Sequence, residues 1–92
     1  MSTEPFDQRV SRALAAIHAG YPSGMGQLYD LLGPRVYGLC RIITADPVAA
    51  EQSTIQTFMR IWTGADGLSH DTAGTRWVLD LACDSARSTT AA

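Results

Sequence analysis

Large apolar residues recur along the chain at helical spacing and divide it into four amphipathic segments. In residues 4–18 they are separated by four, four and three positions, which places them on one face of a helix. Similar stripes predict helices over residues 23–43 and 47–62, and a fourth helix that ends near Arg87. Neither the alternation typical of strands nor an internal repeat occurs. The pattern therefore predicts an all-α fold, a compact four-helix domain.

Glycines, prolines and capping residues mark the ends of these segments. The stretch "AGYPSGMG" separates the first two helices, and in "TADP" Asp46 can cap a helix whose first residue is Pro47. Pro34 lies inside the second helix and cannot donate to the carbonyl four residues back. A bend or a break is therefore predicted near residues 30–33.

The fourth helix and the C-terminus are bounded less sharply. Ser69 or Asp71 can cap the fourth helix after the polar loop "TGADGLSH". The last residues offer no apolar anchor. We therefore expect one helical domain over residues 1–88 and a disordered tail at residues 89–92.

Of the 92 residues 46% are hydrophobic, which is typical of a folded domain, and 17% are charged, which is below the usual value of roughly 25%. A net charge of -2 argues against a general affinity for phosphate backbones, which depends on clustered basic residues. The start "MSTEPFDQRV" is unlike a secretory signal, and no run is long enough for a membrane span. We therefore expect a cytoplasmic protein with no membrane partner.

Metal binding and catalysis receive little support. The two histidines and two cysteines lack the paired spacing that preorganises a zinc site; they are His18, Cys40, His70 and Cys83. No GxSxG, phosphate-binding loop or HExxH motif occurs. Asp80 and Asp84 lie one helical turn apart, which favours a solvated face over a general-acid pair. We expect no enzyme activity, cofactor or metal, and keep these classes as the weakest alternative.

The aromatic residues and the third helix are interpreted from the same periodicity. Four aromatics that could stack on bases are predicted to be core residues, because each lies in or beside an apolar stripe; they are Tyr29, Tyr37, Trp62 and Trp77. In the third helix the predicted buried face comprises Val48, Ile55, Met59 and Trp62. The predicted outward face comprises Ser53, Gln56, Thr57 and Arg60, with Gln52 at its margin. That outward face is either an ordinary solvated surface or a partner-docking surface.

The order of residues, beyond their periodicity, resembles a known family. The stretch "GYPSGMGQLYDLLGPRVYGLCRIITADPVAAEQSTIQTFMRIW" is similar to region 2 of bacterial sigma factors, in particular the extracytoplasmic-function group. In that family "LYDRYAPRVYGLALRIL" leads through "GDP" into "AEDVVQEVFLRVW". The matching residues here are Leu28, Tyr29, Asp30, Pro34, Arg35, Val36, Tyr37, Gly38, Glu51, Phe58, Arg60 and Trp62. A further stretch, "AGTRWVLDLACDSAR", looks like the family's "ARAWLLTIARNRALD".

The resemblance implies a domain that docks on the clamp helices of RNA polymerase core and contacts the promoter minus-ten element, without a cofactor. In the family the docking surface lies on the third helix and the end of the second. The residues expected to dock on polymerase are Glu51, Gln52, Gln56 and Arg60. The residues expected nearest the promoter DNA are Arg76 and Arg87 on the fourth helix.

The chain departs from the family pattern on these two surfaces. The Asp, Gln and Glu of "EDVVQE" correspond to Gln52, Ile55 and Gln56. Charge-assisted hydrogen bonds are roughly twice as strong as neutral ones, so we expect docking that is either weakened or redirected. The fourth helix carries Asp80 and Asp84, and carboxylates repel a phosphate backbone. The helix-turn-helix domain that usually follows in the family is not part of this sequence.

Two hypotheses follow from the resemblance. The first is a sigma-factor region 2-like module of transcription initiation that binds polymerase core and contacts the promoter. The second is a sigma-like regulator that has lost promoter opening and binds a protein partner, such as polymerase, an anti-sigma factor or its own copy. The acidic fourth helix favours the second, and the match through the first three helices favours the first.

Overall fold

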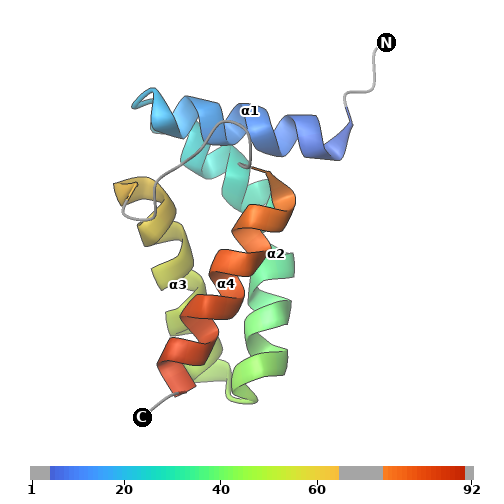
Figure 1. Cartoon of the computed structure of the whole chain (residues 1–92), viewed down its shortest axis with the longest axis vertical. Coiled ribbons are helices and arrows are strands. Elements are labelled where there is room, and N and C mark those ends of the chain that lie inside the picture. The colour runs from blue at the N-terminus through green and yellow to red at the C-terminus, as the bar shows by residue number, and fades with distance from the viewer. Residues whose placement is uncertain (1–4, 65–73, 91–92) are drawn as a thin grey trace.

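Four helices make up most of the chain that the structure describes, as the periodicity predicts. The computed structural model describes residues 5–64 and 74–90. It contains α1 (Phe6–His18), α2 (Ser23–Thr44), α3 (Pro47–Thr63) and α4 (Thr75–Thr90). The helices α2, α3 and α4 run along the length of the molecule, and α1 crosses one end of them (Figure 1). The prediction of an all-α, four-helix domain is confirmed.

All four helices contribute to one core. The buried hydrophobic side chains come from α1 (Val10, Ala13, Leu14, Ile17), α2 (Leu28, Leu32, Val36, Cys40), α3 (Ala50, Phe58, Ile61) and α4 (Val78, Leu81, Ala82, Ala86). Helix α1 packs mainly on α2, whereas α2, α3 and α4 all pack against one another. The start of α4 is also tied to α1, because the Thr75 hydroxyl donates to the Asp7 carboxylate at 2.6 Å.

The turn between α2 and α3 follows the local prediction closely. Asp46 has an extended backbone, and its Oδ2 accepts a hydrogen bond from the Ala49 amide at 3.2 Å. Pro47 occupies the first helical position, where its missing amide proton is not needed. Ala45 adopts the left-handed conformation that ends α2, with φ of 57°. These contacts fix the angle at which α3 leaves α2.

Removing the Asp46 cap should weaken the domain measurably. In Asp46→Ala the Ala49 amide loses its side-chain acceptor, and we expect the free energy of unfolding to fall by about 1 kcal/mol. Urea denaturation followed by circular dichroism measures this change. Asp46→Asn keeps a capping oxygen and is the matched control. Equal loss in both variants would show that the cap contributes through charge and not through the hydrogen bond.

Two predicted boundaries differ from the structure. Helix α2 continues through Pro34 without a break, so of the two predicted outcomes, a bend or a break, the break is absent; Leu32 and Val36 on either side of Pro34 are fully buried. Helix α4 continues to Thr90, three residues beyond the predicted end. In this last turn the Thr89 hydroxyl donates to the Ser85 carbonyl at 3.0 Å, and the Thr89 Oγ1 lies 2.9 Å from the Ser53 Oγ of α3.

Other predictions concern residues that the structure does not describe. The expected caps of the fourth helix, Ser69 and Asp71, belong to this group. So do the last two residues of the expected tail. The first two residues of that tail, by contrast, are helical.

Candidate protein-docking surface

The inward face of α3 is built largely from small and hydroxyl-bearing side chains. Its buried residues are Ala50, Ser53, Thr54, Thr57, Phe58 and Ile61. The hydroxyls of Ser53, Thr54 and Thr57 donate to the carbonyls four residues earlier, at 2.8, 2.8 and 2.7 Å. Because the helix itself satisfies these hydroxyls, they enter the interior without leaving an unpaired donor. The prediction that Ser53 and Thr57 face outward is therefore wrong.

The outward face of α3 carries the large apolar side chains that the sequence pattern assigned to the core. Val48, Ile55, Met59 and Trp62 are 62%, 56%, 58% and 47% exposed. At the helical repeat these positions lie within about 60° of one another and span roughly 21 Å along the axis. We call this line of four residues the α3 stripe. Exposed apolar patches of this kind mark interaction sites on small domains.

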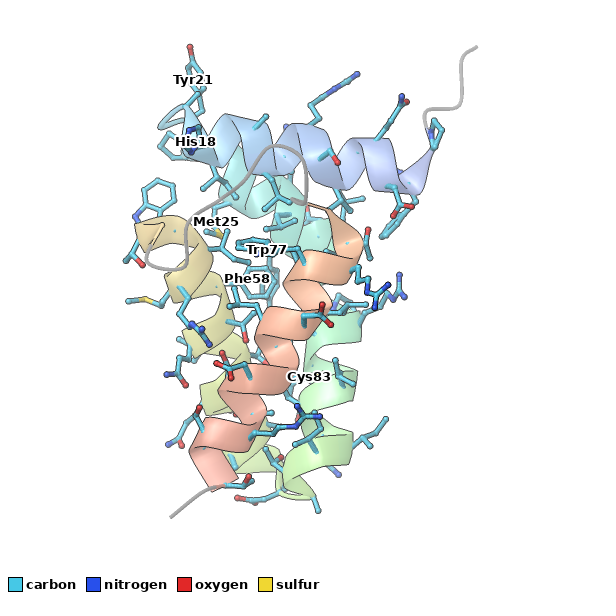
Figure 2. All side chains as sticks on the ribbon, viewed as in Figure 1. His18, Tyr21, Met25, Phe58, Trp77 and Cys83 are labelled. Carbon is cyan, nitrogen blue, oxygen red and sulfur yellow. The ribbon has the colours of Figure 1, made fainter. Side chains whose placement is uncertain are left out.

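The stripe borders a groove between α2 and α3. The groove encloses about 610 Å³ and is lined by Met25, Tyr29, Tyr37, Glu51, Thr54, Ile55, Phe58, Met59 and Trp62. At its base the rings of Tyr29 and Phe58 meet at 5.3 Å between centroids, tilted by 56°, a favourable aromatic geometry. Phe58 projects from α3 into the molecule, and Met25 comes from α2 near the end crossed by α1 (Figure 2). Glu51 supplies the one carboxylate of the lining.

The aromatic residues are divided between this surface and the core. Tyr29, Tyr37 and Trp62 are exposed and line the groove, so their predicted core positions are wrong. Their side chains line the groove and remain accessible to solvent, whereas the buried residues of α3 beside them are mostly small or hydroxyl-bearing. Trp77 is partly buried against the core, in agreement with the prediction. The exposed aromatics therefore belong to the same surface as the α3 stripe.

Three of the four residues expected to dock on polymerase lie on this surface. Glu51, Gln52 and Gln56 are all exposed, with Glu51 in the groove and the two amides along the other edge of the stripe. Arg60 is different, because its Nη1 donates to Asp84 Oδ2 at 2.9 Å and to Ser85 Oγ at 3.0 Å on α4. Its side chain is only 23% exposed. Arg60 thus links α3 to α4, and its predicted outward projection is wrong.

The residues expected nearest the DNA do not form a basic patch. Arg76 and Arg87 are exposed on one side of α4, but they are roughly 16 Å apart along the helix axis. Asp80 is also exposed and lies between them on the same side. Asp84 is paired with Arg60. The exposed side of α4 therefore lacks the clustered positive charge on which phosphate binding depends.

The two cysteines are free thiols in the interior and at its edge. Cys40 is buried and its Sγ lies 4.0 Å from the Ala82 carbonyl, while Cys83 is half-buried on α4 (Figure 2). Burial raises the pKa of the Cys40 thiol, partly offset by a hydrogen bond with Thr54. Within residues 5–64 and 74–90 no three acidic, histidine or cysteine side chains come together as metal ligands. His70 falls outside those residues.

The buried Cys40 thiol should make stability depend on alkaline pH. Its pKa is higher in the folded than in the unfolded chain, so above about pH 8.5 the unfolded chain loses a proton that the folded chain keeps. We therefore expect the free energy of unfolding to fall as the pH rises above that value, by at most about 1.4 kcal/mol per pH unit. Urea denaturation at several pH values in this range measures how steeply the free energy of unfolding falls with pH. The Cys40→Ala variant should show a smaller pH dependence, and the Cys83→Ala variant should keep that of the wild type. An unchanged pH dependence in Cys40→Ala would contradict the assignment of the effect to Cys40.

No protein-family model, curated protein or solved structure matches this chain. Among the described residues no helix has both the length and the apolar character needed to cross a membrane. The geometry of the α3 stripe and the groove is therefore the main evidence for function.

Sequence reasoning missed Ile55 and Met59 as surface residues. A usable signal was present, since Val48, Ile55 and Trp62 recur every seven residues. That heptad spacing is typical of a helix face that packs along another helix. The spacing alone does not distinguish a second helix of the same chain from a helix of a partner. A prediction from the spacing therefore places the stripe in the core of this chain.

Proposed function

We propose that this domain is a sigma-factor region 2-like module of transcription initiation, which docks on the clamp helices of RNA polymerase core through the α3 stripe and the adjoining groove. The observation that supports this most is the inverted pattern of α3, with hydroxyls inside and large apolar side chains outside. A folded domain gains nothing from exposing such side chains unless a partner covers them.

The positions of the family resemblance agree with this surface. The Asp, Gln and Glu of the family's "EDVVQE" correspond to Gln52, Ile55 and Gln56, and all three are exposed on α3. The three valines of "VVQEV" correspond to Ser53, Thr54 and Thr57, which are buried. The proposed docking face thus keeps the family's arrangement while replacing charge by amide and apolar groups.

The structure also gives a reason for a second candidate, the sigma-like regulator that docks on a protein partner but does not open promoters. Arg76 and Arg87 are separated, and Asp80 lies between them. Phosphate contacts need clustered positive charge, and a carboxylate at this position repels the backbone. Promoter contact through these two arginines is therefore the weaker part of the proposal.

A binding experiment separates the candidates. The purified domain is tested for retention of RNA polymerase core, and fluorescence anisotropy measures its binding to a single-stranded minus-ten oligonucleotide beside it. Binding to core and to DNA supports the initiation module. Retention of core without DNA binding supports the regulator. Loss of both contradicts the proposed function.

Restoring the family's carboxylates should strengthen docking. In Gln52→Asp and Gln56→Glu the neutral amides become charged acceptors, and charge-assisted bonds are roughly twice as strong. We expect each change to tighten binding to core by about 1 kcal/mol, or fivefold in Kd, measured by titration of labelled domain. Gln8→Glu adds the same charge on the exposed face of α1 and should change nothing. Unchanged affinity in both reversions would show that α3 does not contact polymerase through these positions.

A further inference from the structure

The α3 stripe has a symmetry that its use as a polymerase contact does not require. Ile55 lies midway between Val48 and Trp62, seven residues from each. If a second α3 runs antiparallel with Ile55 at the centre, Val48 of one copy meets Trp62 of the other. A small side chain then faces a large one at both ends of the pair, which suits the interlocking packing of helix surfaces. Heptad spacing matches the shallow crossing angle of about 20° at which two helices pack along their length.

The charges of this face also suit a second copy. The stripe itself is uncharged, and the side chains along one edge of it, Gln52 and Gln56, are neutral amides that can donate and accept. The carboxylate beside the stripe, Glu51, falls opposite Met59 of the antiparallel copy, because the two are equally distant from Ile55. The two copies therefore bring no like charges into direct opposition, which would be destabilising.

We infer that the α3 stripe pairs with the α3 stripe of a second copy of this chain, as an antiparallel, two-fold symmetric helix pair centred on Ile55. Such an interface is isologous and closes after two copies, so it makes a dimer and not a filament. One helix face is a small contact area, and self-association is expected in the micromolar range.

The pairing has a regulatory consequence, which rests on the proposed function. The dimer covers the face that the monomer would present to polymerase, so the two interactions exclude each other. At high concentration most of the domain would be dimeric and unable to bind polymerase. Polymerase would then compete with the second copy for the monomer. The pairing itself depends on no polymerase contact and is tested without it.

Self-association is measured on the full chain by sedimentation equilibrium from micromolar to millimolar concentration. We expect the mass to rise from monomer to dimer, and Ile55→Asp to weaken the dimer by at least about tenfold, since it places two carboxylates at the two-fold axis. The matched control is Ile42→Asp, because Ile42 is 79% exposed on α2 and five residues from the groove residue Tyr37. Those five residues turn it about 140° away around the helix, so dimerisation should be unaffected.

Three results would overturn the inference: a monomer at all concentrations, a dimer that Ile55→Asp leaves intact, or a dimer that Ile42→Asp weakens equally. Circular dichroism verifies that each variant folds, and Met59→Asp replaces Ile55→Asp if that variant does not. Because polymerase is absent from this experiment, its outcome is independent of whether the proposed function fails.

Cysteine cross-linking tests the direction of the pair. In a chain carrying Cys83→Ser, oxidation with diamide should link Ile55→Cys into a dimer, because Ile55 faces its own copy. Val48→Cys should form no cross-linked dimer under the same conditions, since its antiparallel partner is Trp62. Efficient linkage of Val48→Cys would indicate a parallel pair and contradict the inferred arrangement.

Discussion

Gly24→Ala is expected to destabilise the domain, although alanine is the better helix former. A Cβ at Gly24 would lie 2.8 Å from the Ala13 carbonyl oxygen, 2.8 Å from the Ala16 Cβ and 2.9 Å from the Ile17 amide nitrogen. Two of these atoms are backbone of α1, so the helices α1 and α2 must move apart to admit the methyl group. Overpacking of this kind costs about 1 to 3 kcal/mol, more than the roughly 1 kcal/mol that alanine gains over glycine in a helix.

The neighbouring Gly26 provides the matched control. It lies on the same turns of α2, is exposed, and a Cβ there meets no atom within 4 Å. Gly26→Ala should therefore stabilise the domain by about 1 kcal/mol through helix propensity alone. Urea denaturation of the two variants gives changes of opposite sign. Stabilisation by both would mean that α1 does not approach α2 at Gly24 as closely as the structure shows.

These two glycines illustrate what the sequence could predict and what it could not. Propensity treats both as weak points of the second helix, each costing about 1 kcal/mol relative to alanine. The close approach of α1 to Gly24 depends on how two helices pack, and single-residue propensities contain no such information. The Asp46 cap and the first residue of α3, Pro47, were predicted correctly because both depend on contacts within four residues.

The orientation of α3 was mispredicted for a different physical reason. Hydrophobic periodicity ranks side chains by polarity, and it therefore predicts that the face with Ser53 and Thr57 is solvated and that the stripe with Ile55 is buried. In the structure the helix backbone accepts both hydroxyl protons, which removes most of the cost of burying them. A helix with such hydroxyls on one face and large apolar groups on the other can be buried on either face, and only its neighbours decide which.

Arg60 shows the same limit for the candidate site. The resemblance to sigma factors placed it on the docking surface, and its spacing from Gln56 is compatible with that. In the structure its guanidinium reaches Asp84 and Ser85 of α4. The partner lies 24 residues further along the chain, so no local pattern could reveal the contact.

Met59→Asp is expected to abolish docking on polymerase core while leaving the domain folded. Met59 lies near the middle of the α3 stripe, lines the groove and is 58% exposed. If a partner helix covers the stripe, the substitution buries an unpaired carboxylate in an apolar contact, which is unfavourable by several kcal/mol. Loss of a central contact of this kind typically weakens binding by at least about 2 kcal/mol, or thirtyfold in Kd.

The measurement is a titration of labelled domain with polymerase core, at domain concentrations low enough to keep it monomeric. Urea denaturation of Met59→Asp should show a free energy of unfolding within about 0.5 kcal/mol of the wild type, since the residue lies outside the core. Ile42→Asp introduces the same charge at an exposed apolar residue on another face and should bind core normally. Normal binding by Met59→Asp would move the polymerase contact away from α3, whereas weak binding by both variants would point to a general effect of added negative charge. Loss in Met59→Asp alone is the result that the inverted pattern of α3 predicts.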